Sequence, residues 1–163
     1  YLNSILAMTN FAQRAKEAGV DGLIMVNLPL EEAADLRQTL SAEGMDLVSL
    51  IAPTTADRRA REIATTGSGF LYYVSLKGTT GSGALAVDEV AERMSFLQTL
   101  TNVPICVGFG IKDAKSAAAV SAHADGVVVG SALVQLMADS PDPATASQRL
   151  QTAIADIRNG LDG

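Results

Sequence analysis

The sequence predicts an α/β fold in which parallel strands alternate with helices. Three observations support this prediction. Short apolar runs rich in β-branched residues recur along the 163-residue chain, as expected of strands that are buried on both faces. Stretches of helical length separate these runs, so that each strand–helix unit takes roughly 25–30 residues. The composition is 48% hydrophobic but only 4% aromatic, with no Trp, which is typical of α/β proteins.

The predicted elements follow one another without a linker or a low-complexity tract. The expected strands are residues 20–26, 47–51, 70–75, 103–107 and 126–129. The first expected helix ends at about residue 18. The others cover residues 31–43, 57–65, 87–100, a short stretch after 110, 131–138 and 145–159. Gly19 and Gly44 are placed to end helices, and Pro29 ends a strand because it has no N–H for the ladder. Residues 139–143, which end in Pro143, are expected to break the helical pattern.

Two glycine turns follow the last two predicted strands. The first is Gly108-Phe109-Gly110, and the second is Gly130-Ser131, which also opens a helix. Parallel neighbouring strands bring both turns to the same end of the sheet. Glycine leaves the backbone N–H groups accessible, and the start of a helix adds unpaired N–H groups and a positive dipole end. We therefore expect an anion site here, best suited to a phosphate.

Composition excludes several classes of function. The net charge of −6 argues against nucleic acid or an anionic membrane as a partner. Cys106 is the one cysteine, which excludes an internal disulfide and a Cys-rich metal site; we expect a buried, inert thiol. No apolar run approaches the ~20 residues of a membrane span, and no signal peptide is visible, so we expect a cytoplasmic protein. Because the chain begins with Tyr1 rather than Met, we expect that an N-terminal part is missing.

Two architectures fit five βα units: an open, doubly wound sheet or part of a (β/α)8 barrel. A barrel needs eight strands and usually ~250 residues, so this chain is too short to close one alone. In such barrels, the phosphate site commonly follows the last two strands. A partial barrel would leave two strand edges unpaired, and we expect either a marginally stable monomer or association through those edges.

Several segments, in this order, resemble the tryptophan synthase α subunit family. They are GVDGLIMVNLPLEEA, LIAPTT, FLYYVSLKGTTG, VGFGIKDA and ADGVVVGSALV. The similarity starts at Tyr1, continues to the end of the chain and corresponds to about the C-terminal two-thirds of the family. It implies one domain over residues 1–163, an α/β partial TIM barrel that contains about the last five βα units.

The resemblance implies a lyase that cleaves indole-3-glycerol phosphate to indole and glyceraldehyde 3-phosphate by a retro-aldol step. Carried over by position, the substrate phosphate is held at four residues: Gly81, Gly110, Gly130 and Ser131. Tyr72 matches the tyrosine that lines the indole pocket. Thr80 matches the threonine of a loop, residues 77–85, that closes over the substrate and excludes water.

Proton transfer in this reaction needs a carboxylate pair. The resemblance implies that the family's catalytic Glu and Asp lie upstream of Tyr1, so no catalytic residue is assigned and we expect this chain to be inactive alone. Asp46 and Asp125 precede strands and would lie at the wrong end of the sheet. Glu31 and Glu32 lie at the right end, but a position in the first turn of a helix explains them without catalysis.

The implied partner is the tryptophan synthase β subunit. Asn3, Asn27 and Pro29 match the family's contact region, and any pyridoxal phosphate would belong to the partner, leaving this chain without a cofactor or metal. The family usually has Asp at the position of Asn27. Two interpretations stay open: a neutral turn residue, because Asn serves in turns as well as Asp, or altered coupling to the partner.

Two alternative functions stay open at this point. One is another phosphate-binding barrel lyase or isomerase, and the other is a non-catalytic fragment that binds phosphate or a partner subunit. His123 is the one histidine, and it is expected in a helix-to-strand connection at the end opposite the glycine turns, where a solvated surface role is favoured. Met25 and Met94 are expected to fill the core.

Overall fold

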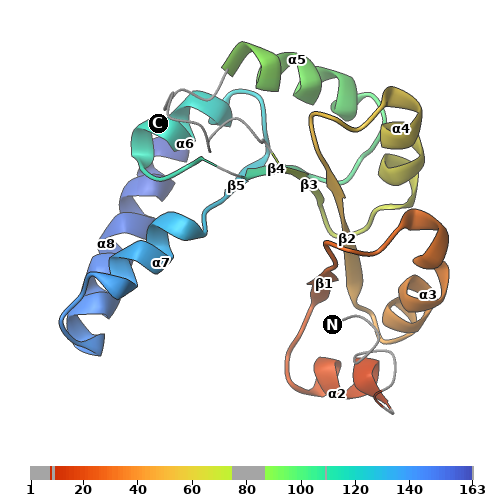
Figure 1. Ribbon diagram of the computed structural model, residues 1–163, viewed down its shortest axis with the longest axis horizontal. Helices are drawn as coiled ribbons and strands as arrows, with labels where there is room; N and C mark the ends of the chain where they lie inside the picture. Colours follow the sequence, from red (N-terminus) through yellow and green to blue (C-terminus); the bar gives the residue numbers. More distant parts are fainter. Residues whose placement is uncertain (1–7, 9, 75–86, 109, 163) are drawn as a thin grey trace.

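The structure, a computed structural model, forms a curved, five-stranded parallel sheet with helices on its outer side (Figure 1). It describes residues 8, 10–74, 87–108 and 110–162. The strand order follows the chain, so every strand pairs in parallel with the one before it. The strands are β1 (Gly22–Ile24), β2 (Asp46–Ile51), β3 (Leu71–Val74), β4 (Ile105–Gly108) and β5 (Gly126–Val128). This arrangement is a half-barrel and confirms the predicted partial TIM barrel, with β1 and β5 at its two edges.

Helices provide the return connections between successive parallel strands, as right-handed βα units require. They are α2 (Phe11–Glu17), the 3-10 turn η1 (Leu30–Glu32), α3 (Ala34–Ala42), α4 (Asp57–Thr66), α5 (Val87–Gln98), α6 (Ala114–Ser121), α7 (Ser131–Ala138) and α8 (Pro143–Asp162). Figure 1 shows α3, α4 and α5 along the convex side of the sheet, while α7 and α8 pack against each other at one end. No helix in the described ranges is long and apolar enough to cross a membrane.

Strand alternation separates the two faces of the sheet. Leu71 and Tyr73 on β3, with Ile105 and Val107 on β4, point to the helices and are almost fully buried. They belong to the larger of two cores, which α4, α5 and α6 complete and in which Met94 is fully buried. The smaller core joins α2 and α3 to β1 and β2, and Met25 packs against it. Both methionines therefore contribute to the cores, as predicted.

Two helix starts differ from the sequence prediction. Glu31 and Glu32 lie in the separate 3-10 turn η1, and α3 begins only at Ala34, so their predicted place in the first turn of the long helix was wrong. The predicted interruption after Ala138 is confirmed, but the last helix begins at Pro143 rather than at Thr145. Proline suits the first position of a helix, where its missing N–H has no partner to lose. Asp142 precedes it and accepts a hydrogen bond from the N–H of Thr145 at 2.9 Å, which caps the helix.

Candidate functional site

The sheet register brings the two glycine turns to the same end of the sheet. Val74, Gly108 and Val128 form one row across β3, β4 and β5, so the three strands end at the same level. Gly110 and Gly130 each follow this row by two residues. Both turns therefore lie at the carboxyl end of the sheet, as predicted, which is where barrel active sites are built.

The start of α7 offers backbone donors at this edge. Ser131 is the first residue of the helix, and Gly130 precedes it without a side-chain cap among the described residues. The carbonyl of Gly130 accepts hydrogen bonds from the N–H groups of Leu133 and Val134, at 3.0 and 3.1 Å. A Cβ built on Gly130 would meet nothing within 4 Å, so the helix start is open. The unpaired N–H groups and the dipole of α7 favour an anion here.

Gly110 shapes the other turn. Its φ of 81° lies in the left-handed region, which a residue with a Cβ adopts only with strain. The backbone thus turns sharply just after β4, close to the end of the strand that neighbours β5. The sequence prediction of a glycine-dependent turn at this place is confirmed in geometry, whereas its role in phosphate binding stays a prediction.

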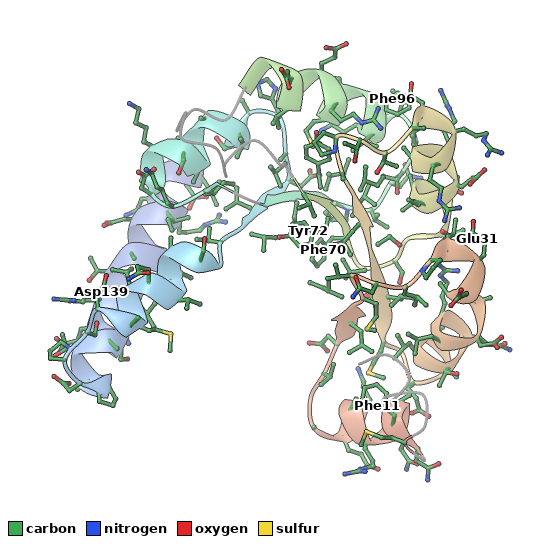
Figure 2. All side chains as sticks on the ribbon, in the orientation of Figure 1. Phe11, Glu31, Phe70, Tyr72, Phe96 and Asp139 are labelled. Atoms are coloured by element: carbon green, nitrogen blue, oxygen red, sulfur yellow. The ribbon has the colours of Figure 1, made fainter. Side chains whose placement is uncertain are left out.

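Tyr72 lies on the face of the sheet opposite the main core. It forms one row with Leu50, Cys106 and Gly126 across four strands. Its ring is half-buried and lies 6.5 Å from the ring of Phe70, centroid to centroid (Figure 2). This concave face offers an aromatic and apolar surface beneath the edge that carries the glycine turns. The surface suits a flat apolar ring, while the role of Tyr72 in lining an indole pocket stays a prediction.

Cys106 occupies the same row and departs from the prediction in one respect. Its side chain is half-buried on the concave face rather than enclosed in the core. Burial raises the pKa of the thiol, with a smaller contribution from the charge of Asp125, so the thiolate is disfavoured. The expectation of a thiol with little nucleophilic character agrees with this pKa direction.

The acidic residues considered as substitutes for catalytic groups have structural partners. Asp125 accepts a hydrogen bond from the N–H of Ile105 at 2.8 Å, at the amino end of the sheet, and Asp46 begins β2 at that same end. The predicted placement of both residues is confirmed. His123, in the connection from α6 to β5, also lies at this end, as predicted.

Glu31 and Asp57 lie near the carboxyl end but face the helix layer. Glu31 pairs with Arg59 of α4, and this bond lowers the pKa of Glu31 to about 2. Asp57 pairs with Arg93 of α5 at 2.6 Å. Sequence reasoning missed both ion pairs, because each joins residues 28 or 36 positions apart and no local pattern signals them. Both carboxylates are therefore directed to arginines of the helix layer and not to the concave face of the sheet.

Two of the three residues predicted to contact a partner lie in the described part of the chain. Asn27 and Pro29 are both exposed in the turn between β1 and η1, while Leu28 between them packs against the smaller core. Val26, just before this turn, is 74% exposed. The turn thus presents its polar and proline side chains outward, as a contact surface requires. Asn3, Thr80 and Gly81 lie outside the described residues.

Among the described residues, no group of three or more His, Cys, Asp or Glu side chains is placed to hold a metal ion. What this part of the chain offers is therefore a set of backbone donors beside an apolar concave face. Such a set can bind and orient an anionic ligand that carries a ring, and it excludes water from one side of that ligand.

Comparison with known proteins gives consistent matches. The family model described as "Tryptophan synthase alpha chain" matches residues 1–161. The chain is 49% identical over 163 residues to the tryptophan synthase alpha chain of Chromobacterium violaceum, covering 99% of this chain and 62% of the relative. It is 43% identical over 169 residues to that of Psychrobacter cryohalolentis, with the same two coverages. The chain thus spans about three-fifths of the length of the curated relatives it matches.

Solved structures agree with the curated sequences. The crystal structure of tryptophan synthase subunit alpha from Legionella pneumophila superposes with a TM-score of 0.85 at 35% identity, over 99% of this chain and 60% of that chain. A structure described as the basis of mutual activation of the tryptophan synthase α2β2 complex from Pyrococcus furiosus gives a TM-score of 0.85 at 31% identity, over 98% and 64%.

Proposed function

Because the chain belongs to the tryptophan synthase alpha chain family, we propose that it serves the cleavage of indole-3-glycerol phosphate to indole and glyceraldehyde 3-phosphate. In this proposal, the part of the chain described here holds the substrate. The observation that supports it most is the meeting of the Gly110 turn and the start of α7 at one sheet edge, above the concave face that carries Tyr72.

The phosphate is placed at the start of α7. Backbone N–H groups at Gly130 and Ser131 and the Ser131 hydroxyl donate to its oxygens, and the helix dipole favours its negative charge. Gly110 gives the neighbouring turn its left-handed backbone conformation. Gly81 and Thr80 are assigned to the same ligand by family resemblance alone.

The indole ring is placed on the concave face beside Tyr72. Aromatic rings prefer offset or edge-to-face contacts, and the half-buried Tyr72 ring offers such a contact. Holding the phosphate at one end and the ring at the other fixes the glycerol carbons between them. Binding energy spent on this orientation lowers the barrier to bond cleavage, even where another part of the protein transfers the protons.

We assign proton transfer to groups outside the described residues. Two acidic side chains near the carboxyl end of the sheet, Glu31 and Asp57, are paired with Arg59 and Arg93 in the helix layer. The proposal is therefore that these 163 residues bind substrate but do not turn it over unaided. The absence of a cofactor and of a metal from this chain stays a prediction from the resemblance, and the cytoplasmic location stays a prediction from the sequence.

The proposed partner is the tryptophan synthase β subunit, which contacts the turn that contains Asn27 and Pro29. Membership in the family and the similarity to the Pyrococcus furiosus chain from an α2β2 complex support this assignment. If any pyridoxal phosphate takes part in the assembly, it belongs to the partner. Asn27 is exposed, so its amide could meet a partner group directly.

A calorimetric titration with glycerol 3-phosphate tests the phosphate assignment. We expect the wild-type chain to bind and Ser131→Glu to lose binding, because the new carboxylate repels the phosphate at the helix start. Ser121→Glu is the matched control: it adds the same charge at the end of α6, toward the amino end of the sheet. Equal binding by all three chains would show that the phosphate does not bind at the start of α7.

A further inference from the structure

The turn proposed to meet the partner has few attachments of its own. After Asn27 and Pro29, the chain makes the single 3-10 turn η1, none of whose residues is buried. Two backbone hydrogen bonds define it: the N–H of Glu32 donates to the carbonyl of Pro29 at 3.0 Å, and the N–H of Ala33 donates to that of Leu30 at 3.2 Å. An element this short does not fix its own orientation.

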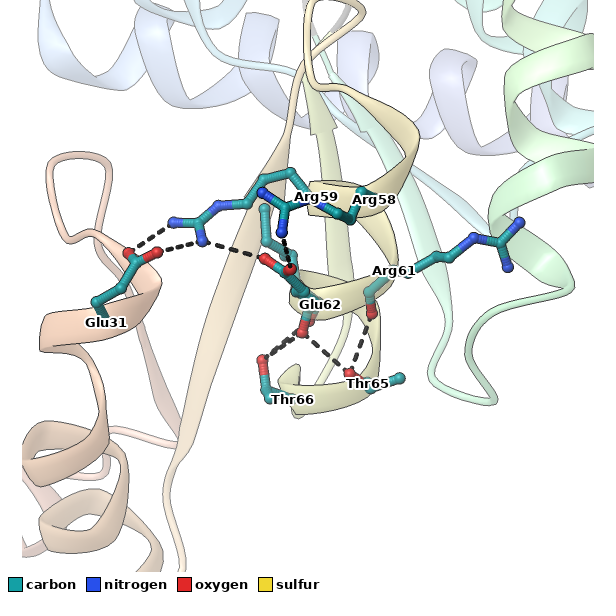
Figure 3. Close-up of polar contacts among 8 residues, drawn as sticks. Glu31, Arg58, Arg59, Arg61, Glu62, Thr65 and Thr66 are labelled. Atoms are coloured by element: carbon teal, nitrogen blue, oxygen red, sulfur yellow. Dashed lines mark hydrogen bonds and ion pairs between the residues drawn. The ribbon is translucent and has the colours of Figure 1, made fainter.

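A side-chain contact from the next helix supplies the missing constraint. The two terminal guanidinium nitrogens of Arg59 on α4, Nη1 and Nη2, donate to the carboxylate of Glu31, and the Nη2–Oε2 distance is 2.7 Å (Figure 3). Arg59 also contacts Glu62, one turn along its own helix, with Nη1 3.3 Å from Oε2. Glu62 of α4 therefore fixes the guanidinium on one side, while two parallel hydrogen bonds join it to Glu31 of η1.

The ion pair between Arg59 and Glu31 affects the orientation of η1 more than the free energy of unfolding of the whole chain. Exposed ion pairs contribute little to the free energy of unfolding, and the side chains of Arg59 and Glu31 are 35% and 66% exposed. A bidentate pair nevertheless fixes both the distance and the angle between the two groups that it joins. Its effect therefore falls on the position of η1, and through Pro29 on the turn that precedes it.

We propose that Arg59 is a positioning residue, which through Glu31 holds the turn of Asn27 and Pro29 in the orientation that the partner binds. This inference rests on the proposed contact between that turn and the β subunit. Arg59 itself lies on α4, behind η1, and acts through Glu31 rather than on the partner. The interaction surface is thus set by an ion pair that is not part of it.

The neighbouring Arg58 offers a matched control. It lies on the same helix, carries the same charge and is 92% exposed, and its ion pair among the described residues is a 3.7 Å contact with Glu62 (Figure 3). Loss of Arg58 changes the net charge of the chain by the same amount as loss of Arg59. Any effect specific to Arg59 therefore reports the contact with Glu31 and not long-range attraction to the partner.

The first test is a double-mutant cycle on affinity for a recombinant tryptophan synthase β subunit from Chromobacterium violaceum, whose α chain is 49% identical to this one. We expect Glu31→Gln and Arg59→Gln each to raise the Kd about fivefold or more. The double variant should bind no worse than either single one, because both remove the same pair. Arg58→Gln should bind as the wild type does. Additive losses from Glu31 and Arg59 would show direct contacts with the partner and overturn the proposal.

The second test follows hydrogen exchange at the amides of Glu32 and Ala33 in the free chain. Exchange should be faster in Glu31→Gln and Arg59→Gln than in the wild type, and unchanged in Arg58→Gln, with the same melting temperature in all four. Unchanged exchange in the Arg59 variant would overturn the positioning role. If the wild type fails to bind the β subunit, the proposed partner surface and its control by Arg59 are both wrong, while exchange still decides whether the pair holds η1.

Discussion

The ring of Tyr72 lies directly over the α-carbon of Gly108. A Cβ placed on Gly108 would lie 2.7 Å from Cζ of Tyr72 and nearer still to its Cε2 and Oη, well inside van der Waals contact. The two residues are diagonal neighbours on β3 and β4, on the concave face. The position of the proposed indole-lining ring thus depends on the absence of a side chain on the next strand.

Gly108→Ala should therefore displace Tyr72. The added methyl group forces the ring off its rotamer or separates the strands, and overpacking of this kind destabilises by about 1–3 kcal/mol. Urea unfolding measures the loss, and a Tyr72→Val second substitution should recover most of it by removing the ring. Gly130→Ala is the control, because its Cβ meets nothing. A Gly108→Ala chain as stable as the wild type would contradict the close contact.

Gly160→Ala should destabilise the chain although alanine favours helices. A Cβ at this position in α8 would lie 2.5 Å from the carbonyl oxygen and 3.0 Å from the Cα of Ala114, at the start of α6. This backbone contact cannot yield, so the clash should exceed the gain of about 1 kcal/mol from helix propensity. Thermal unfolding should show a lower Tm. Asn159→Ala, one residue earlier and exposed, should leave the Tm unchanged or raise it. A higher Tm for Gly160→Ala would show that α6 and α8 do not pack this closely.

Asp113 should stabilise α6 in a pH-dependent way. Its carboxylate accepts hydrogen bonds from the hydroxyl and the N–H of Ser116, at 2.7 and 2.8 Å, and these hold its pKa below the usual value of 3.8. Because the folded pKa is depressed, this stabilisation is complete above 3.8 and is lost as the pH falls through the folded pKa. Asp113→Ala should cost about 1 kcal/mol at neutral pH and less at about pH 2. An unfolding free-energy difference between the two chains that does not change with pH would contradict the cap.

The isolated chain should release no indole from indole-3-glycerol phosphate. Glu31 and Asp57 are paired with arginines in the helix layer, and proton transfer is assigned to groups outside the described residues. A spectrophotometric assay for indole measures the rate, with the full-length Chromobacterium violaceum alpha chain as the positive control. Turnover by this chain that is abolished by Glu31→Gln would assign proton transfer to Glu31 and overturn the division of roles proposed above.

Local sequence patterns predicted most of the framework. All five strands, the glycine turns and the helix start at Ser131 follow from β-branched runs and residue preferences that act within a few positions. The fully buried Met94 was predicted in the same way. Such features depend on periodicity and backbone conformation, which a short window of sequence contains.

The remaining features depend on contacts between distant segments. The ion pair of Arg59 with Glu31 and the contact of Tyr72 with Gly108 each join segments from different βα units. The helix start at Pro143 is different, because the cap that Asp142 gives to Thr145 is local and the sequence prediction began the helix two residues too late. The residues themselves predicted an anion site at the two glycine turns, whereas Tyr72, Thr80 and Gly81 were assigned through family resemblance alone.

The central claim concerns the two ends of one substrate. The carboxyl end of the sheet binds its phosphate, and the concave face of the sheet binds its indole ring. Titration of the ¹⁵N-labelled chain with indole-3-glycerol phosphate, followed by amide shifts, tests it most directly. The account predicts concurrent saturable shifts at Gly110, Gly130 and Ser131 and at Tyr72, with glycerol 3-phosphate moving only the first three. Shifts confined to other residues, or none in the range where the full-length relative binds, would contradict it.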